Sequence, residues 1–204
     1  SLNELTNRQE VKERIIEIKN QVSTVAMEQG SEFFTYPDPA TPFEREDLTP
    51  AVSGIRFGPV VEESIVRVHS HHQPMLEPVF SAQDISGMAK FYKTKRDYGT
   101  SDAINATSIL ASNLGIHSLR VINPEKANLF AQRLVVSAYV KQFVLNYGLK
   151  VQNKAKDDCN CTENTPEYQQ LLLDYLIKFL ADQDTGISIF TGTENADGSI
   201  TWTR

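Results

Sequence analysis

The chain has 204 residues and a mass of 22.9 kDa, the size of one domain or of one domain with an extension. A composition that is 40% hydrophobic and 23% charged is typical of a folded protein rather than a disordered one. The 20 basic residues against 26 acidic ones give a net charge of −6, and no Lys/Arg cluster forms a basic face. We therefore expect neither a nucleic-acid partner nor binding to an anionic membrane surface.

The first part of the chain predicts one helix followed by strands. Apolar residues recur at helical spacing from Val11 to Val22, which indicates an amphipathic helix over residues 6–22. The segment from Pro37 to Pro50 contains four prolines and is predicted to be a loop. Four short strands are expected, at residues 24–27, 32–36, 52–57 and 64–69.

The second part of the chain interleaves helices with two hairpins. We expect helices over residues 81–96, 124–147 and 166–183. Glycine-containing turns at residues 113–115 and 197–198 predict hairpins that pair 107–112 with 117–122 and 187–191 with 199–203. Interleaved helices and strands predict an α/β or α+β fold with a mixed sheet.

The sequence shows neither a transmembrane helix nor a signal peptide, and its two cysteines do not predict a disulfide. The longest apolar stretch, near residues 134–140, is far shorter than the roughly 20 residues of a transmembrane helix, and no signal-peptide pattern opens the chain. Because the chain begins at Ser1 without methionine, we expect a trimmed piece whose export signal, if one exists, lies upstream. A disulfide between Cys159 and Cys161 would be hard to close without strain, so two free thiols in a polar loop are expected.

Three of the four histidines lie within four positions, at His69, His71 and His72. The preceding residues 64–68 are predicted to form a strand, in which side chains alternate between the two faces. His69 and His71 would then project from the same face, roughly 6–7 Å apart, and His72 from the other. Two such imidazoles can bind one metal ion, or they can be surface histidines at the end of a strand.

The sequence Ser81-Ala-Gln-Asp84 follows and is typical of a helix start. Ser-x-x-Asp resembles a capping box, and a carboxylate in the first turn is favoured by the helix dipole. A capping carboxylate still has lone pairs for a metal. Together with His69 and His71, Asp84 would give the three protein ligands of a catalytic zinc site, with a fourth position for water. Such zinc lowers the pKa of its water to about 7, and a nearby Glu or Asp would act as general base.

The pattern His69-x-His71-x(9)-Ser81-x-x-Asp84 resembles the signature of the JAB/MPN (JAMM) zinc metalloproteases. That signature also has a glutamate on an earlier strand, often two positions before a glycine, and Glu28-Gln29-Gly30 is similar to it. The loop after His71 is about two residues longer than the family's usual seven. The chain is also similar to JAB-like domains of Bacteroidetes proteins, in the Phe80–Ile85 turn, in Gly186-Ile187-Ser188 and in a final strand with Trp202.

The resemblance implies a role for each residue of the motif. His69, His71 and Asp84 would hold Zn²⁺, Glu28 would be the general base, and Ser81 would hydrogen-bond the developing oxyanion. The expected function is hydrolysis of a peptide or isopeptide bond in a protein or peptide substrate. The alternative is a JAB-like binding or assembly module without catalytic activity.

Further expectations concern the remaining glutamates and the domain as a whole. Glu32 is a rival to Glu28 as the base, whereas Glu62 and Glu63 lie about 20 Å from His69 along the strand. The resemblance implies one JAB/MPN-like domain over residues 1–204, with a largely antiparallel sheet flanked by helices. The motif core would span 22–123, and a C-terminal extension of helices and a hairpin would span 124–204. The sequence leaves substrate, compartment and oligomeric state open.

Overall fold

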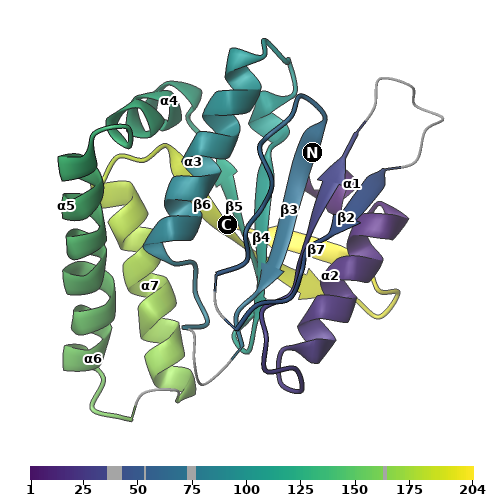
Figure 1. Ribbon diagram of the computed structural model, residues 1–204. Coiled ribbons are helices and arrows are strands. Elements are labelled where there is room, and N and C mark those ends of the chain that lie inside the picture. Colours follow the sequence, from purple (N-terminus) through teal and green to yellow (C-terminus); the bar gives the residue numbers. More distant parts are fainter. Residues whose placement is uncertain (36–42, 53, 73–76, 163–164) are drawn as a thin grey trace.

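The structure is a computed structural model that describes residues 1–204 except 36–42, 53, 73–76 and 163–164 (Figure 1). The described strands form one sheet of seven, in the order β2-β1-β3-β4-β5-β6-β7. Only the β3–β4 pair is parallel among these strands, so the expected mixed α/β class is confirmed. The strands are β1 Gly30–Phe34, β2 Glu44–Asp47, β3 Ser64–Ser70, β4 Thr107–Ser112, β5 Gly115–Val121, β6 Ile187–Glu194 and β7 Ile200–Thr203.

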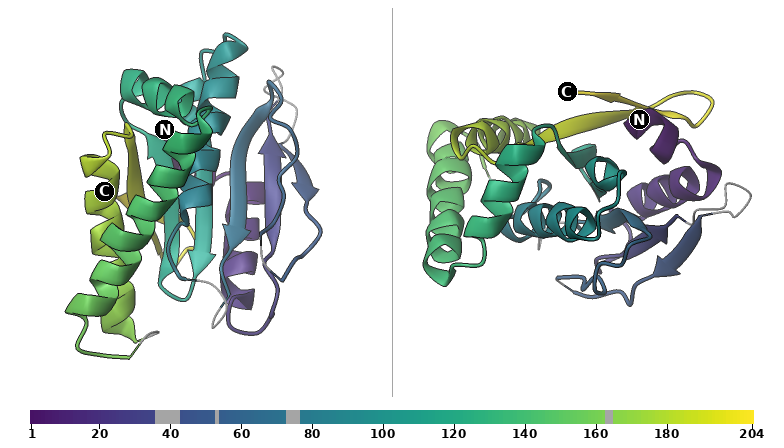
Figure 2. Two further views of the ribbon diagram at one scale, coloured as in Figure 1. Left: turned by 60° about the vertical axis from the view of Figure 1, so that its left-hand side comes forward. Right: turned by 90° about the horizontal axis from the view of Figure 1, so that it is seen from above.

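Helices cover both faces of this sheet (Figures 1 and 2). The α-helices are α1 Leu2–Thr6, α2 Gln9–Gln21, α3 Ala82–Asp97, α4 Pro124–Arg133, α5 Ser137–Tyr147, α6 Lys154–Asp158 and α7 Pro166–Asp182. A 3₁₀ turn at Ala103–Asn105 and a π-helical turn at Gly148–Asn153 complete the helical elements. Within the described residues, no helix is both long enough and apolar enough to cross a bilayer.

The two hydrophobic cores lie on opposite faces of the sheet. Helices α1 and α2 contribute to the smaller core, which includes Val66 and Val68 of β3. Helices α3 to α7 build the larger core on the other face, together with Leu119 and Val121 of β5. Side chains alternate along a strand, so Arg67 and His69 project away from the smaller core and toward α3. The central part of the sheet therefore presents polar residues of β3 to the start of a helix.

The predicted helices are largely confirmed, with differences near residues 2–8 and at residues 134–136. The predicted helix 6–22 corresponds to α2, which begins at Gln9 because the chain turns at residues 7–8, and the short helix α1 before that turn was not predicted. The predicted helix 124–147 breaks at residues 134–136, where Val136 is extended with φ −89° and ψ 112°. Val135 and Val136 are branched at Cβ, which lowers helix propensity, and their side chains are exposed rather than packed.

The cysteine segment differs from its prediction. Helix α6 extends to Asp158, within the predicted polar loop, and Cys159 and Cys161 form a disulfide. The expectation of two free thiols is therefore wrong. The Cα atoms of this pair lie 5.0 Å apart, inside the usual range for a disulfide, so the backbone between α6 and α7 brings the sulfurs together despite the short spacing.

The predicted strands at residues 24–27 and 52–57 are wrong among the residues that the structure describes. Glu28 instead forms an isolated antiparallel bridge with Ala51, and residues 54–57 run without a strand partner. The predicted loop at residues 37–50 contains the edge strand β2, while its first part lies outside the described residues. Because β2 is exposed throughout and entirely charged, it lacks the alternation that marks a half-buried strand.

Candidate metal centre

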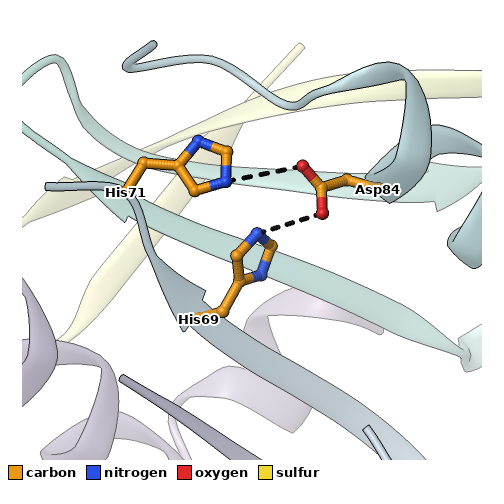
Figure 3. A group of neighbouring side chains, drawn as sticks. All are labelled: His69, His71 and Asp84. Atoms are coloured by element: carbon orange, nitrogen blue, oxygen red, sulfur yellow. Dashed lines mark ion pairs between the residues drawn. The ribbon is translucent and has the colours of Figure 1, made fainter. Parts of the chain in front are cut away.

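The side chains of His69, His71 and Asp84 converge where β3 ends and α3 begins (Figure 3). His69 is the penultimate residue of β3, His71 follows the strand, and Asp84 lies in the first turn of α3. Asp84 Oδ1 is 3.3 Å from His69 Nε2, and Asp84 Oδ2 is 3.5 Å from His71 Nε2. One ligand atom from each residue lies within 4.8 Å of the other two. The sequence-based grouping of these three residues is thus reproduced in space.

These donors fit a tetrahedral metal ion. Zn–N and Zn–O bonds of about 2.0–2.1 Å place neighbouring ligand atoms of a tetrahedron roughly 3.3 Å apart, which is the distance between His69 Nε2 and Asp84 Oδ1, and one ligand atom from each of the three residues lies within 4.8 Å of the others. Both ring nitrogens of His69 are buried without a hydrogen-bond partner among the described residues. His69 Nε2 faces Asp84 Oδ1 across 3.3 Å without a hydrogen bond, and a cation between the two atoms would satisfy both. The group can therefore hold a metal ion through two nitrogens and one oxygen.

A backbone carbonyl orients the ring of His71. His71 Nδ1 lies 2.8 Å from the carbonyl oxygen of Glu77, which can only accept a hydrogen bond. Nδ1 therefore carries the proton, and the lone pair of Nε2 faces Asp84. Gln152, in the π-helical turn after α5, donates to the Glu77 carboxylate at 3.0 Å. The C-terminal helices thus support the segment that holds a candidate ligand.

Ser81 and Asp84 form the predicted capping box. Ser81 Oγ accepts from the backbone N–H of Asp84 at 3.2 Å, and the Ser81 backbone N–H donates to Asp84 Oδ2 at 2.7 Å. Ser81 Oγ also donates to the same Oδ2 at 2.7 Å. These bonds fix the carboxylate so that Oδ1 faces His69. Asp84 therefore takes part in the cap of α3 and is also a candidate metal ligand.

The charges of the three candidate ligands depend on each other. Burial opposes ionisation of Asp84, but the His69 and His71 rings and the Ser81 hydroxyl outweigh it and hold the pKa of Asp84 well below its usual value. Burial would lower the pKa of His69, but the Asp84 carboxylate raises it. Burial and the neighbouring His69 ring lower the pKa of His71. An ionised Asp84 and a neutral His71 are the forms that bind a metal.

Glu28 lies beside the candidate ligands and its rival Glu32 does not. Glu28 is only 3% exposed, and its Oε1 lies 3.8 Å from His71 Nε2. Its Oε2 accepts from the backbone N–H of Ile55 at 2.7 Å. Glu32 is instead paired with Arg67 at 3.0 Å, in register across β1 and β3. The position of Glu28 favours it over Glu32 as the candidate base.

His72 stands apart from the candidate ligands. Its ring is buried, and neither nitrogen has a hydrogen-bond partner within the described part of the chain. The group of donor atoms that can share one metal ion contains His69 and His71 but not His72. This grouping agrees with the prediction that His69 and His71 share one face of the strand and that His72 lies on the other. Residues 73–76 of the longer loop after His71 lie outside the described residues.

The candidate ligands open onto a cleft of about 690 Å³. Glu28, His69, His71, Ser81 and Asp84 all line it. A volume of this size falls in the range of pockets that take small molecules or peptide segments, about 300–1,000 Å³. The five residues of the sequence motif thus share one cavity.

Comparisons with known proteins identify no relative. No family model, no curated protein and no solved structure matches this chain.

Several residues that line the cleft were not singled out from the sequence. They include Phe57, Arg67, Gly87, Met88 and Phe91. Gly87 could have been noticed in the sequence, because a glycine in the middle of a helix lowers helix stability. Its presence there suggests a packing or functional reason. The others follow helix or strand periodicity and cannot be told from core residues by spacing alone.

Proposed function

We propose that this protein is a zinc-dependent hydrolase that cleaves a peptide or isopeptide bond. The convergence of two imidazoles and a carboxylate beside a buried glutamate, in one cleft, carries the proposal. When bound by such ligands, zinc supplies a water with a pKa near 7 and polarises a substrate carbonyl. The resemblance of the motif to the JAB/MPN metalloproteases supports the same chemistry and suggests the bond that is cleaved.

Glu28 is the residue that moves protons in this proposal. Its Oε1 lies 3.8 Å from His71 Nε2, so a water bound at the candidate ligands would be within reach of this carboxylate. The carboxylate accepts a proton from the attacking water and later donates it to the leaving amine. The hydrogen bond from the Ile55 backbone holds Oε2, which leaves Oε1 free for this exchange.

Ser81 has a narrower role than the resemblance implies. Its hydroxyl already donates to Asp84 Oδ2, so it orients the carboxylate before any substrate arrives. To stabilise an oxyanion, the hydroxyl would have to turn from Asp84 toward the substrate. Positioning of Asp84 is therefore the role that its contacts support directly.

The test combines metal analysis with a cleavage assay. Protein purified without chelator is expected to contain one zinc per chain and to cut members of a mixed peptide library, with cleavage read by mass spectrometry. Chelation should abolish cleavage and zinc should restore it. Glu28→Gln should keep its zinc but cut about 100-fold more slowly or worse, since it removes the general base.

Each outcome separates the candidate functions. Absence of zinc binding would refute the metal centre. Zinc binding without cleavage of any peptide would favour the alternative of a binding or assembly module. Equal cleavage by Glu28→Gln and the wild type would show that Glu28 is not the base.

A further inference from the structure

The cleft is much larger than a metal ion and its water need. A water occupies about 30 Å³ in the liquid, against about 690 Å³ for the cleft. The space beyond the candidate ligands lies between α3 and the face of β3 that carries Arg67 and His69, and Gly54, Ile55 and Phe57 form a further wall. The shape and the lining residues of this space therefore determine which substrate side chain fits next to the reacting bond.

One face of α3 joins the metal end of the cleft to an apolar wall. Asp84, Gly87, Met88 and Phe91 all line the cleft, at spacings of three, four and seven residues from Asp84. Residues at these spacings lie on the same face of a helix. At a rise of 1.5 Å per residue, Met88 lies about 6 Å and Phe91 about 10 Å beyond Asp84 along the axis. The apolar wall thus begins at Met88, about one helical turn beyond Asp84.

Two aromatic rings and Arg67 form the far part of the cleft. The Arg67 guanidinium lies 4.9 Å from the centre of the Phe57 ring and 4.7 Å from that of Phe91. The pairing of Arg67 with Glu32 fixes the guanidinium and balances its charge. Phe57 also lies edge-on to His69, with ring centres 6.2 Å apart, so it connects this part of the cleft to the metal end. The stack is a rigid, mostly apolar surface.

Gly87 keeps the space in front of this surface open. A Cβ added at Gly87 would meet nothing within 4 Å, although the residue lies in the middle of α3. Glycine costs helix stability at such a position, and no close approach of another backbone requires it here. A side chain at residue 87 would instead enter the cleft between the candidate ligands and Phe91.

From these observations we infer that the cleft is a specificity pocket for an apolar substrate side chain next to the scissile bond, and that Gly87 determines its capacity. The inference rests on the proposed function, because it places the reacting carbonyl at His69, His71 and Asp84. The substrate class is then a peptide with a large apolar or aromatic residue at the cleavage site. An anionic side chain would lose hydration without gaining a free partner, since Arg67 is already paired with Glu32.

Two metal-binding probes that differ only in their side chain test the pocket. We would measure binding of acetohydroxamate and 3-phenylpropanehydroxamate to the zinc-loaded protein by calorimetry. The wild type should bind the phenyl probe at least about 10-fold more tightly, because a buried phenyl group contributes that much. Gly87→Leu should reduce this preference to about 2-fold or less, with zinc affinity unchanged.

Matched variants keep the test specific. Leucine has the higher helix propensity, so Gly87→Leu is expected to fold. Lys90→Leu adds the same side chain to an exposed position of α3 outside the cleft, and it should retain the full preference. Gly87→Ala should retain most of it. Equal affinity of the wild type for both probes, with zinc bound, would overturn the pocket and leave the proposed function standing.

A metal-free measurement decides the case in which zinc does not bind. N-acetylphenylalaninamide would be titrated into metal-free protein while backbone amide shifts are followed by NMR. Shifts at Met88 and Phe91 that disappear in Gly87→Leu would support the pocket even if the metal centre failed. An absence of shifts up to the solubility limit of the probe would overturn it.

Discussion

The three clustered histidines differ in what each one can bind. His71 has its Nδ1 fixed by the Glu77 carbonyl and its Nε2 directed at Asp84, whereas His72 is outside the group of candidate ligands. We therefore predict that His71→Ala lowers zinc affinity by at least about 100-fold, more than the loss from changing a residue that only supports a ligand. His72→Ala should leave zinc affinity within a few-fold of the wild type. Competition with a chromophoric chelator measures both.

The comparison needs evidence that both variants fold. Circular dichroism and thermal unfolding of the metal-free proteins supply that control. Equal losses of zinc affinity in folded His71→Ala and His72→Ala would contradict the grouping of His69, His71 and Asp84.

At the level of residues, the sequence predicted the candidate ligands because their spacing is local and chemically distinctive. The two-residue period of a strand brings His69 and His71 together, and a capping box fixes Asp84. Glu28 is 41 positions before His69, so it could be placed only through the family resemblance. The choice between Glu28 and Glu32 depended on the partner of Arg67, which no local pattern reveals.

At the level of elements, the junction between α7 and β6 depends on one glycine. Gly186 has φ +69°, and a Cβ there would lie 2.5 Å from the backbone atoms Ala127 N and Asn123 O. Its carbonyl also accepts from the backbone N–H groups of Ile122 and Asn123. Residue 186 therefore ties the end of β5 and the start of α4 to the strand that follows α7.

We predict that Gly186→Ala is strongly destabilising, by more than about 2 kcal/mol in the free energy of unfolding, because both strain and overpacking act there. Gly198→Ala is the matched control. Gly198 has a similar φ of +74° but open space around its Cβ, so only the cost of the backbone conformation remains, about 1 kcal/mol. Urea denaturation of both variants measures the difference. Equal losses would contradict a steric role for Gly186.

Elements with a clear period were predicted and those set by tertiary contacts were not. The helices α3 and α7 have apolar faces at helical spacing, and they begin and end within about two residues of their predicted bounds. The edge strand β2 has only charged residues and exists through pairing with β1. The segment 54–57 contains residues typical of a strand, but its backbone is held by the Glu28 carboxylate instead of a neighbouring strand.

At the level of the whole molecule, helices on both faces leave the middle of the sheet largely buried (Figure 1). Every residue of β4 is buried, and His117 of the adjacent β5 is only 2% exposed. His117 Nδ1 has no hydrogen-bond partner among the described residues. Burial therefore lowers the pKa of His117 from 6.5 to about 4. His117 lies in the strand that the sequence predicted over residues 117–122.

This shift makes stability depend on pH. The unfolded chain takes up a proton at His117 near pH 6.5, while the folded protein resists it until about pH 4. The contribution is therefore complete above pH 6.5, and the free energy of unfolding falls as the pH decreases from 6.5 to 4, by up to about 3 kcal/mol from this residue. His69, His71 and Asp84 also titrate with shifted pKa values, so the wild type alone does not isolate His117.

The difference between wild type and His117→Leu isolates the residue. Leucine removes the titration and leaves no buried nitrogen unpaired, so the variant should lose less stability than the wild type between pH 6.5 and 4. Urea denaturation at half-unit pH steps, on metal-free protein, measures the two curves. They should diverge by about 1.4 kcal/mol per pH unit in the steepest part, the value for one proton. Parallel curves would show that His117 is protonated equally in both states, and hence that the centre of the sheet is open to water.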